Sequence, residues 1–223
     1  MTITYLIGNG FDLGLGLKTK YQDFVKWYRG QKPKSGAIRW LKKQMAGKKK
    51  LELWGDAEMA FGQLPFSGRG QESIGAYREC YADFVSSFVT YLRIQNGRFL
   101  IPRQDRQAVA KQFLEHVLGL DAFMAKAAED HYLTKRKKTP VKVNFIVFNY
   151  TDTIEKILDF QETPKTYTIE LGGKQVEVVV QEICHVHGSL HEEEFVFGVD
   201  NAEQIAEDAI GRFCTSNGGM IKP

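Results

Sequence analysis

Three short segments carry the residues whose types and spacing could do chemistry. The first follows the apolar run Ile3–Ile7 and reads Gly-Asn-Gly-Phe-Asp over residues 8–12. Glycines tolerate positive φ and carry no Cβ, so their amides can approach a phosphate closely. A helix N-terminus just after them would add a partial positive charge. The candidates for ligand binding on this turn are Gly8, Asn9, Gly10 and Phe11.

Asp12 closes this segment and has a different candidate role. Because like charges repel, its carboxylate suits a ribose hydroxyl or a catalytic water better than a phosphate. The segment lacks the third glycine of the dinucleotide fingerprint and the lysine of a P-loop. A plain tight turn is therefore the competing interpretation of residues 8–12.

The second segment, Phe148–Glu155, lies where a predicted strand ends and a predicted helix begins. Ligands of open α/β sheets bind at the carboxyl ends of the strands, so Asn149, Thr151 and Asp152 could direct donors and acceptors into that crevice. The competing interpretation is helix capping by Thr151 or Asp152, with Glu155 three residues after the latter. We expect capping by one of these two residues and ligand contact by Asn149.

The third segment covers residues 184–190, with His185 and His187 on one face of a predicted strand. A metal site here would use Cys184, His187 and His191. Zinc sites normally draw ligand pairs from two segments, so we expect no metal. His187 precedes a glycine at the strand end and is the candidate acid–base group, since histidine ordinarily titrates near neutral pH. A histidine that is hydrogen-bonded inside the core is the alternative.

Short β-branched and aromatic runs predict the strands that must position these segments. Residues 166–180 alternate polar and apolar side chains around two glycines, which predicts a β-hairpin. The expected strands are Ile3–Ile7, Val141–Phe148, Thr166–Leu171, Lys174–Val180, Ile183–His187 and Phe195–Phe197.

Helical spacing dominates the middle of the chain. Aromatic residues recur at intervals of three and four along Glu72–Arg93, and we expect this stripe to be core rather than a base-stacking surface. A capping-box pattern predicts a further helix that starts at Thr19. The other expected helices are Arg103–Leu118, Asp121–Tyr132, Asp152–Asp159 and Ala202–Phe213.

These elements predict a single α/β domain over residues 1–223. The sheet comes from both ends of the sequence, with flanking helices and a helical insertion at about residues 20–135.

Composition narrows the class of protein. Of 223 residues, 43% are hydrophobic, which excludes a disordered chain. No apolar run approaches the roughly 18 residues that a membrane span needs, and no basic region precedes an apolar one at the N-terminus. Three widely spaced cysteines argue against a disulfide framework. We expect a soluble, cytoplasmic protein without membrane contact, and the sequence carries no signal of its oligomeric state.

Charge is unevenly spread along the chain. Lys18–Lys50 holds 12 basic residues and one acidic residue, Asp23. Such asymmetry can mark a surface that faces nucleic acid, although a solvated basic loop is the competing interpretation. A nucleic-acid-binding or nuclease effector is therefore an alternative hypothesis. A metal-dependent nuclease would draw its carboxylates from Asp12, Asp56, Glu58 and Asp200.

Four ordered blocks resemble the signature of the AbiH family of bacteriophage abortive-infection proteins, and they bracket almost the whole chain. The blocks are Ile7–Leu13 with Gly16–Phe24, Trp54–Glu58, Phe148–Glu155, and His187–Ser189 with Phe197–Asn201. The resemblance implies a role in phage defence, with a phage-derived trigger as a partner.

The order of the segments is also similar to that of sirtuin-like NAD-binding domains. This resemblance implies a Rossmann-like, sirtuin-like sheet in which Gly8 and Gly10 cradle the dinucleotide. It further implies that Asn149 lies near the nicotinamide ribose and that His187 acts on ribose hydroxyls. Sirtuin deacetylases carry a four-cysteine zinc module, so three scattered cysteines argue against deacetylation.

The resulting hypothesis is a phage-defence effector that binds an adenine-type nucleotide, with NAD as the leading candidate, and hydrolyses it without a required cofactor. Cleavage of an N-glycosidic bond passes through an oxocarbenium-like state, which carboxylates and other acceptors stabilise. His187 would be the acid–base group, Asn149 would position ribose or water, and Asp12 would stabilise positive charge. Glu58 is a second carboxylate candidate, or else an exposed residue of a helix capped by Asp56. A sensor domain without turnover is a further alternative.

Overall fold

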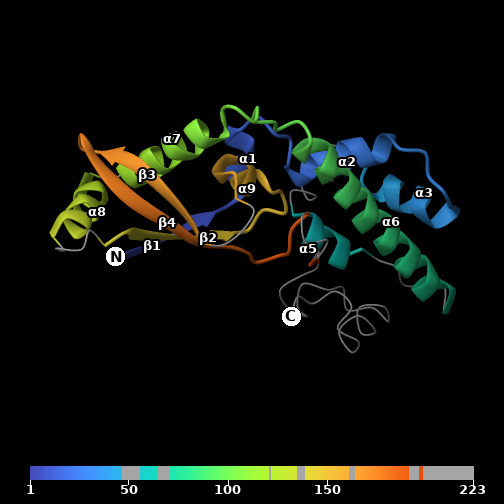
Figure 1. Ribbon diagram of the computed structural model, residues 1–223. Helices are drawn as coiled ribbons and strands as arrows, with labels where there is room; N and C mark the ends of the chain where they lie inside the picture. Colours follow the sequence, from blue (N-terminus) through green and yellow to red (C-terminus); the bar gives the residue numbers. More distant parts are fainter. Residues whose placement is uncertain are drawn as a thin grey trace. The chain divides into compact units, whose positions relative to one another are not determined.

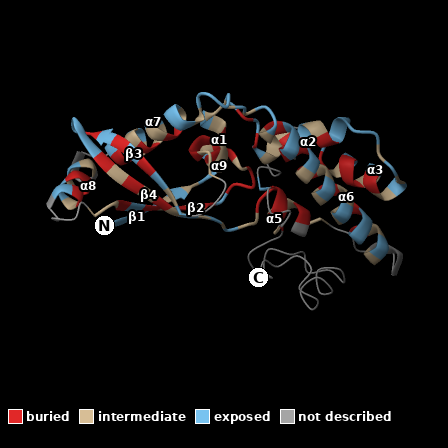
Figure 2. Ribbon diagram, viewed as in Figure 1, coloured by how far each residue is buried: buried red, intermediate tan, exposed pale blue. Residues whose placement is uncertain are grey.

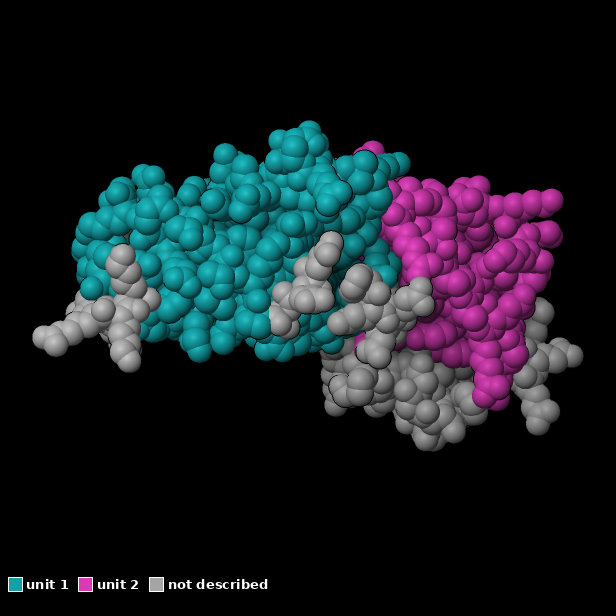
Figure 3. Space-filling view, viewed as in Figure 1, with its two compact units in different colours: residues 1–15, 96–193 teal, residues 16–95, 194–223 magenta. Residues whose placement is uncertain are grey.

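The computed structural model, drawn as a ribbon in Figure 1, describes residues 1–46, 56–64, 71–120, 122–134, 139–160, 164–190 and 196–197. The chain divides into two compact units (Figure 3). Unit 1 comprises Met1–Leu15 and Asn96–Glu193, and unit 2 comprises Gly16–Gln95 and Glu194–Pro223.

Unit 1 is built on an open four-stranded sheet in the order β1-β2-β4-β3. Strand β2 pairs in parallel with both β1 and β4, whereas β3 pairs with β4 in the antiparallel direction. The carboxyl ends of the three parallel strands therefore lie at one edge of the sheet. The strands are β1 (Thr2–Ile7), β2 (Val141–Val147), β3 (Lys165–Leu171) and β4 (Lys174–His185).

Strands β3 and β4 form the predicted hairpin. Gly172 and Gly173 occupy its turn with φ of 56° and 76°, and two successive positive φ values are those of a type I′ turn. Strand β4 is longer than predicted, because Lys174–His185 is one continuous strand. The expectation of a separate strand over Ile183–His187 is therefore wrong, and the strand ends two residues before His187.

A β-bulge in β4 decides which of its side chains face the core. Val143 of β2 pairs with Val180, but the next residue, Asn144, pairs with Glu182, so Gln181 is the extra residue. Since side chains alternate along a strand, one extra residue moves every later side chain to the opposite face. His185 consequently aligns with the buried Val147.

Helices cover the buried face of this sheet. Helix α7 (Arg106–Gly119) packs on β3, and helix α8 (Ala122–Thr134) packs on β2 and β4. Along β2 the residues Val141, Val143, Phe145 and Val147 are buried and alternate with more exposed ones, an alternation that Figure 2 shows for the sheet. The sequence predicted this strand from its β-branched and aromatic residues, and its end at Val147 lies one residue before the predicted end.

Unit 2 is helical and has an aromatic core. Its described helices are α2 (Tyr21–Gly30), α3 (Gly36–Gln44), α5 (Ala57–Gly62) and α6 (Gln71–Asn96), the last of which ends at the boundary with unit 1. Phe84 and Phe88 of α6 pack against Phe24 at ring-centroid distances of 5.0 and 4.9 Å. The prediction that the aromatic stripe is core is confirmed.

The mixed α/β fold with an open sheet and flanking helices is confirmed, and its finer assignment stays a prediction. Among the described strands β1 lies at a sheet edge, whereas the first strand of the classic dinucleotide-binding sheet is internal. The helical middle is divided, because residues 16–95 belong to unit 2 while α7 and α8 belong to unit 1.

Several element boundaries differ from the sequence-based ones. Helix α2 begins at Tyr21 with Lys20 at its N-cap and no side-chain cap, so the predicted start at Thr19 is wrong. Val196 and Phe197 are not in a strand, while Phe195 and the predicted helix Ala202–Phe213 lie outside the described residues. No helix within the described ranges is long and apolar enough to cross a membrane.

Part of the basic segment serves the fold of unit 2. Lys42 is buried, and its ammonium donates to the carbonyl oxygens of Tyr28 and Gln31 at 2.7 Å each. The ammonium also lies 4.2 Å from the centroid of the Tyr28 ring. Burial lowers the pKa of Lys42, although the nearby Asp83 carboxylate acts in the opposite direction. Lys42 therefore closes the C-terminal end of α2 rather than facing a ligand.

Replacement of this buried cation should destabilise unit 2. The variant Lys42→Met removes the ammonium donor from the carbonyl oxygens of Tyr28 and Gln31, although the Tyr28 oxygen still accepts from the Gln31 amide. We therefore expect a loss of about 1–3 kcal/mol in the free energy of unfolding. Lys43→Met, at the exposed neighbouring position, is the matched control and should change it by less than about 0.5 kcal/mol. Urea unfolding followed by tryptophan fluorescence reports on unit 2, because Trp27, Trp40 and Trp54 all belong to it. Equal stability of the two variants would contradict the role given to Lys42.

Candidate functional site

The three candidate segments lie side by side at the carboxyl edge of the parallel strands in unit 1. The Phe148 amide donates to the Ile7 carbonyl at 2.8 Å, and the Val186 amide donates to the Val147 carbonyl at 2.9 Å. Strand pairing thus continues one residue beyond each strand. The side-chain amide of Asn149 donates to the Gly8 carbonyl at 3.1 Å and ties the first segment to the second.

The first segment is a helix start rather than a glycine turn. Helix α1 (Asn9–Gly14) begins directly after Gly8, which has φ of −109°. Neither Gly8 nor Gly10 has a positive φ, and the competing interpretation of residues 8–12 as a plain tight turn is wrong because a helix starts there. A Cβ built on either glycine would meet no heavy atom within 4 Å. The backbone of residues 8–10 is therefore exposed and sterically open to a ligand.

Asp12 is enclosed by the chain's own hydroxyl groups. It is 1% exposed, and its two oxygens accept from Thr151 Oγ1 at 2.6 Å and from Thr153 Oγ1 at 2.7 Å. Burial raises the pKa of Asp12, and the two hydroxyl donors only partly offset this effect. The carboxyl group thus joins α1 to the start of helix α9 (Thr153–Leu158). Direct contact of Asp12 or Thr151 with a ligand stays a prediction.

The expected helix cap is wrong. Asp152 occupies the N-cap position of α9, but its side chain accepts no bond from a helix amide. Its φ and ψ of −93° and 29° are not the extended values that aim an N-cap side chain at the first turn. The Asp152 carboxylate instead pairs with Lys156 Nζ at 2.9 Å.

His187 lies in a turn beyond the end of β4. Its ring centroid is 6.0 Å from that of Phe148 and 6.1 Å from that of Tyr150. The following Gly188 has φ of 78°, a conformation that other residues adopt only at a cost, so the turn needs glycine. The Leu190 amide donates to the Tyr150 carbonyl at 2.8 Å and anchors this segment to the second one.

The structure adds a histidine–carboxylate pair that the sequence analysis did not assign to the site. His185 Nδ1 lies 2.8 Å from the Asn149 carbonyl oxygen, which can only accept, so this nitrogen carries a proton. His185 Nε2 lies 2.6 Å from Glu155 Oε1. An unprotonated imidazole nitrogen and a carboxylate oxygen are both acceptors, so a hydrogen bond between Nε2 and Oε1 needs one proton. This proton is carried by either His185 or Glu155 and is shared between them. The side chains are 4% and 19% exposed.

The local sequence does not indicate that these two residues pair. Its pattern predicted that Glu155 belongs to a capping box and that His185 shares a strand face with His187. The bulge at Gln181 puts His185 on the helix-covered face, where α9 brings Glu155 to it. A bulge of this kind has no distinctive residue pattern here, so the pairing of these two side chains required the tertiary structure.

The other proposed acidic residues in the described ranges have contacts within their own units. In unit 2, Asp56 caps α5 by accepting from the Met59 amide at 2.9 Å, as predicted. Glu58 is buried and accepts from the Tyr21 hydroxyl at 2.9 Å, so of the two alternatives for this residue the exposed helix position is wrong. Among the described residues no group of three or more His, Cys, Asp or Glu side chains could hold a metal. His191 and Asp200 lie outside the described residues.

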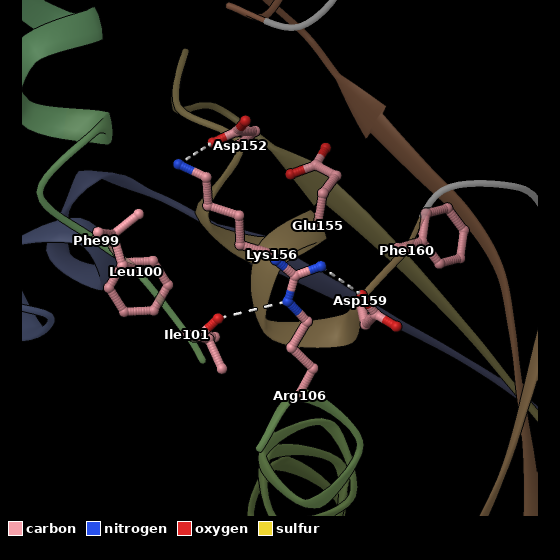
Figure 4. Close-up of a pocket in the computed structure, with 9 residues that line it drawn as sticks. All are labelled: Phe99, Leu100, Ile101, Arg106, Asp152, Glu155, Lys156, Asp159 and Phe160. Atoms are coloured by element: carbon pink, nitrogen blue, oxygen red, sulfur yellow. Dashed lines mark hydrogen bonds and ion pairs between the residues drawn. The ribbon is translucent and has the colours of Figure 1, made fainter. Parts of the chain in front are cut away.

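A cavity of about 230 Å³ adjoins the second segment (Figure 4). Asp152 and Glu155 contribute to its wall, whereas Gly8, Asn149 and His187 do not line it. The candidate site thus has two parts within unit 1: the open edge at α1 and the His187 turn, and this cavity beside α9.

Comparison with known protein families identifies a family to which the chain is similar. The family model described as bacteriophage abortive infection AbiH matches residues 4–218, which is nearly the whole chain. No match was found among the curated proteins, and none among the solved structures.

The buried Asp12 should make stability depend on pH. Since its folded-state pKa is raised, the stability that it contributes is fully present below the unfolded pKa of about 3.9 and is lost as the pH rises through the folded value. We expect the stability of the wild type to fall relative to that of Asp12→Asn between pH 4 and pH 7. Urea unfolding at several pH values measures this difference, with Asp105→Asn as the control for loss of an exposed carboxylate. A wild type that gains stability relative to Asp12→Asn as the pH rises would contradict the raised pKa.

Proposed function

The chain belongs to the bacteriophage abortive infection AbiH family, and we propose that in this defence role it binds and hydrolyses an adenine-type nucleotide, with NAD as the specific candidate. The family assignment supports abortive infection as the function. The nucleotide and its hydrolysis are the part that we add.

One observation carries this proposal: the segments after β1, β2 and β4 converge at the carboxyl edge of the parallel strands. Ile7, Val147 and His185 are aligned in register, and a side-chain bond joins Asn149 to Gly8. Ligands of open α/β sheets bind in the crevice outside this edge. The open backbone at residues 8–10 supports close approach of a sugar-phosphate there.

The proposed roles follow from the contacts of each side chain. His187 is the acid–base group, because it lies in the third segment on a turn fixed by Gly188. Asn149 is a positioning residue, since its side chain holds the Gly8 carbonyl and its carbonyl oxygen accepts from His185. Asp12 positions the second segment through Thr151 and Thr153.

The nucleic-acid alternative has less support from the described residues. Lys42 donates to the Tyr28 carbonyl oxygen at the end of α2, and Lys34 forms an ion pair with Asp83 at 3.1 Å. Asp12, Asp56 and Glu58 each have a hydrogen bond within their own unit that serves the fold of that unit. Arg39 and Lys43 on α3 are exposed basic residues that a nucleic acid could still contact.

Hydrolysis of NAD should depend on His187. General acid–base groups contribute about 10²–10⁴-fold to rate, so His187→Ala should lower the release of free nicotinamide by about 100-fold or more. His116→Ala removes an exposed histidine from α7 of the same unit and should leave turnover unchanged. Nicotinamide release by the two variants is followed by chromatography. Equal turnover in both would reject the role of His187, and binding without turnover in the wild type would favour a sensor domain.

Gly10→Ala should separate stability from ligand binding. Gly10 lies within α1 and has open space at its Cβ, so alanine should raise the free energy of unfolding by up to about 0.5–1 kcal/mol. The added methyl group would obstruct a ligand that approaches this backbone, and we expect NAD binding to weaken. Calorimetric titration with NAD and thermal unfolding measure the two effects. Unchanged affinity would remove the first segment from the proposed site.

A further inference from the structure

The sheet of unit 1 has an edge strand on each of its long sides, β1 on one and β3 on the other (Figure 1). An edge strand presents backbone N–H and C=O groups that no neighbouring strand pairs, so another strand can add to it. Native proteins block such edges with charged side chains, proline, bulges or a covering helix. The two edge strands of this sheet differ in these features.

The edge at β3 is blocked. The Glu170 amide donates to the Glu115 carboxylate of α7 at 2.9 Å, and α7 packs on the strand. Lys165 and Glu170 also place charged side chains along β3. A strand that added here would have to displace the Glu115 contact and approach these charges.

The edge at β1 carries none of these features. Its six residues read Thr-Ile-Thr-Tyr-Leu-Ile, without a charged residue or a proline. Its pairing with β2 runs from Thr2 to Ile7 without a bulge, and no described strand lies beyond it. An uncharged, regular edge of this kind favours pairing with another strand.

The ladder with β2 shows which backbone groups of β1 face outward. The Phe148 amide donates to the Ile7 carbonyl at 2.8 Å, so Ile7 directs its backbone groups toward β2. Successive residues of a strand direct these groups to opposite sides. Leu6 therefore directs its N–H and C=O away from the sheet, as do Thr4 and Thr2, and all three residues are exposed.

Leu6 adds an apolar side chain to this edge. Since Ile3 is buried under the helices, alternation puts Leu6 on the opposite face of the sheet. Its exposed fraction of 69% leaves most of a leucine in water. A further strand beside β1 would cover part of this surface, which favours association.

We propose that β1 pairs in the antiparallel direction with β1 of a second copy of this chain, so that the two sheets join into one. A twofold axis makes such a contact self-complementary. The second copy presents the same uncharged edge, so no like charges oppose each other across the axis. This inference is independent of the proposed function.

The outward-facing positions fix the register of the pair. In an antiparallel ladder, residues whose backbone groups face each other form hydrogen-bonded pairs. The longest symmetrical register centres on Thr4, which pairs with Thr4 of the second copy, while Thr2 pairs with Leu6 of the second copy. On the helix-covered face, Ile3 then lies opposite Tyr5 of the second copy. Thr–Thr and aromatic–β-branched pairs are among the favourable cross-strand pairs.

Sedimentation velocity of the full chain tests whether the dimer forms. Pairing along one strand is a small contact, and interfaces at the low end of the size range belong to weak complexes. The measurement therefore extends to about 100 µM, where a micromolar complex is mostly formed. We expect the sedimentation coefficient to rise with concentration toward that of a dimer. A chain that stays monomeric over this range overturns the proposal.

The variant Thr4→Pro tests the edge itself. Proline removes an amide that faces away from β2, a position that edge strands tolerate, and by symmetry the dimer loses both central hydrogen bonds. We expect association to weaken about tenfold or more. Thr4→Ala keeps the amide and is the matched control, which should associate within a few-fold of the wild type. Association of Thr4→Pro at the wild-type level overturns the proposal.

Cysteine crosslinking tests the register and does not depend on the proline variant. Hydrogen-bonded partners have Cα atoms about 5.5 Å apart, within the range of about 4.4–6.8 Å that a disulfide spans. Thr4→Cys should therefore give disulfide-linked dimers on mild oxidation. In Leu6→Cys the two new cysteines would lie about 14 Å apart along the strands, so this variant is the control.

The wild type, with its three cysteines, supplies the background of crosslinking. Thr4→Cys should exceed this background, and Leu6→Cys should not. A Thr4→Cys variant that crosslinks no more than the wild type or Leu6→Cys overturns the proposal, even where sedimentation shows a dimer, because the copies would then meet through another surface. Neither measurement involves NAD, so failure here leaves the proposed function as it stands.

Discussion

The parallel pairing of β2 with β1 and β4 is the constraint on which the candidate site depends. It brings Ile7, Val147 and His185 to one edge in register, although these residues come from distant parts of the chain. Each strand then delivers its following segment to the same place. Every polar contact described at this edge, including Asn149 with Gly8, exists only because the strands run in the same direction.

The polar contacts at this edge differ in their consequences. The buried Asp12 carboxylate accepts hydrogen bonds from the hydroxyl groups of Thr151 and Thr153. These bonds hold two backbone segments together, and they occupy polar groups that could otherwise bind a ligand. His185 with Glu155 leaves Oε2 of the glutamate without a partner among the described residues. The contacts of Asp12 give rigidity, whereas the His185–Glu155 pair leaves a buried acceptor unsatisfied at a cost of about 1–3 kcal/mol.

Sequence reasoning was most successful where a local period decides the structure. A run of β-branched and aromatic residues predicted β2, and alternation predicted the β3–β4 hairpin. The three-and-four spacing along α6 predicted an aromatic core. It failed at the ends of elements. Gly8 and Gly10 read as a turn but start α1, and Asp152 occupies an N-cap position without capping. At such positions a few backbone angles choose between alternatives of similar energy, and tertiary contacts make the choice.

The sequence by itself determined the mixed α/β class, most of the described helices and strands, and membership of the AbiH family, because apolar periodicity and ordered motifs are local properties. Only the tertiary structure decided which polar side chains meet. The bulge at Gln181 turned His185 toward Glu155, and strand order brought Asp12 to Thr151 across 139 positions of sequence. Hydrogen-bond partners so far apart depend on register and strand order, and no local pattern of residues encodes either.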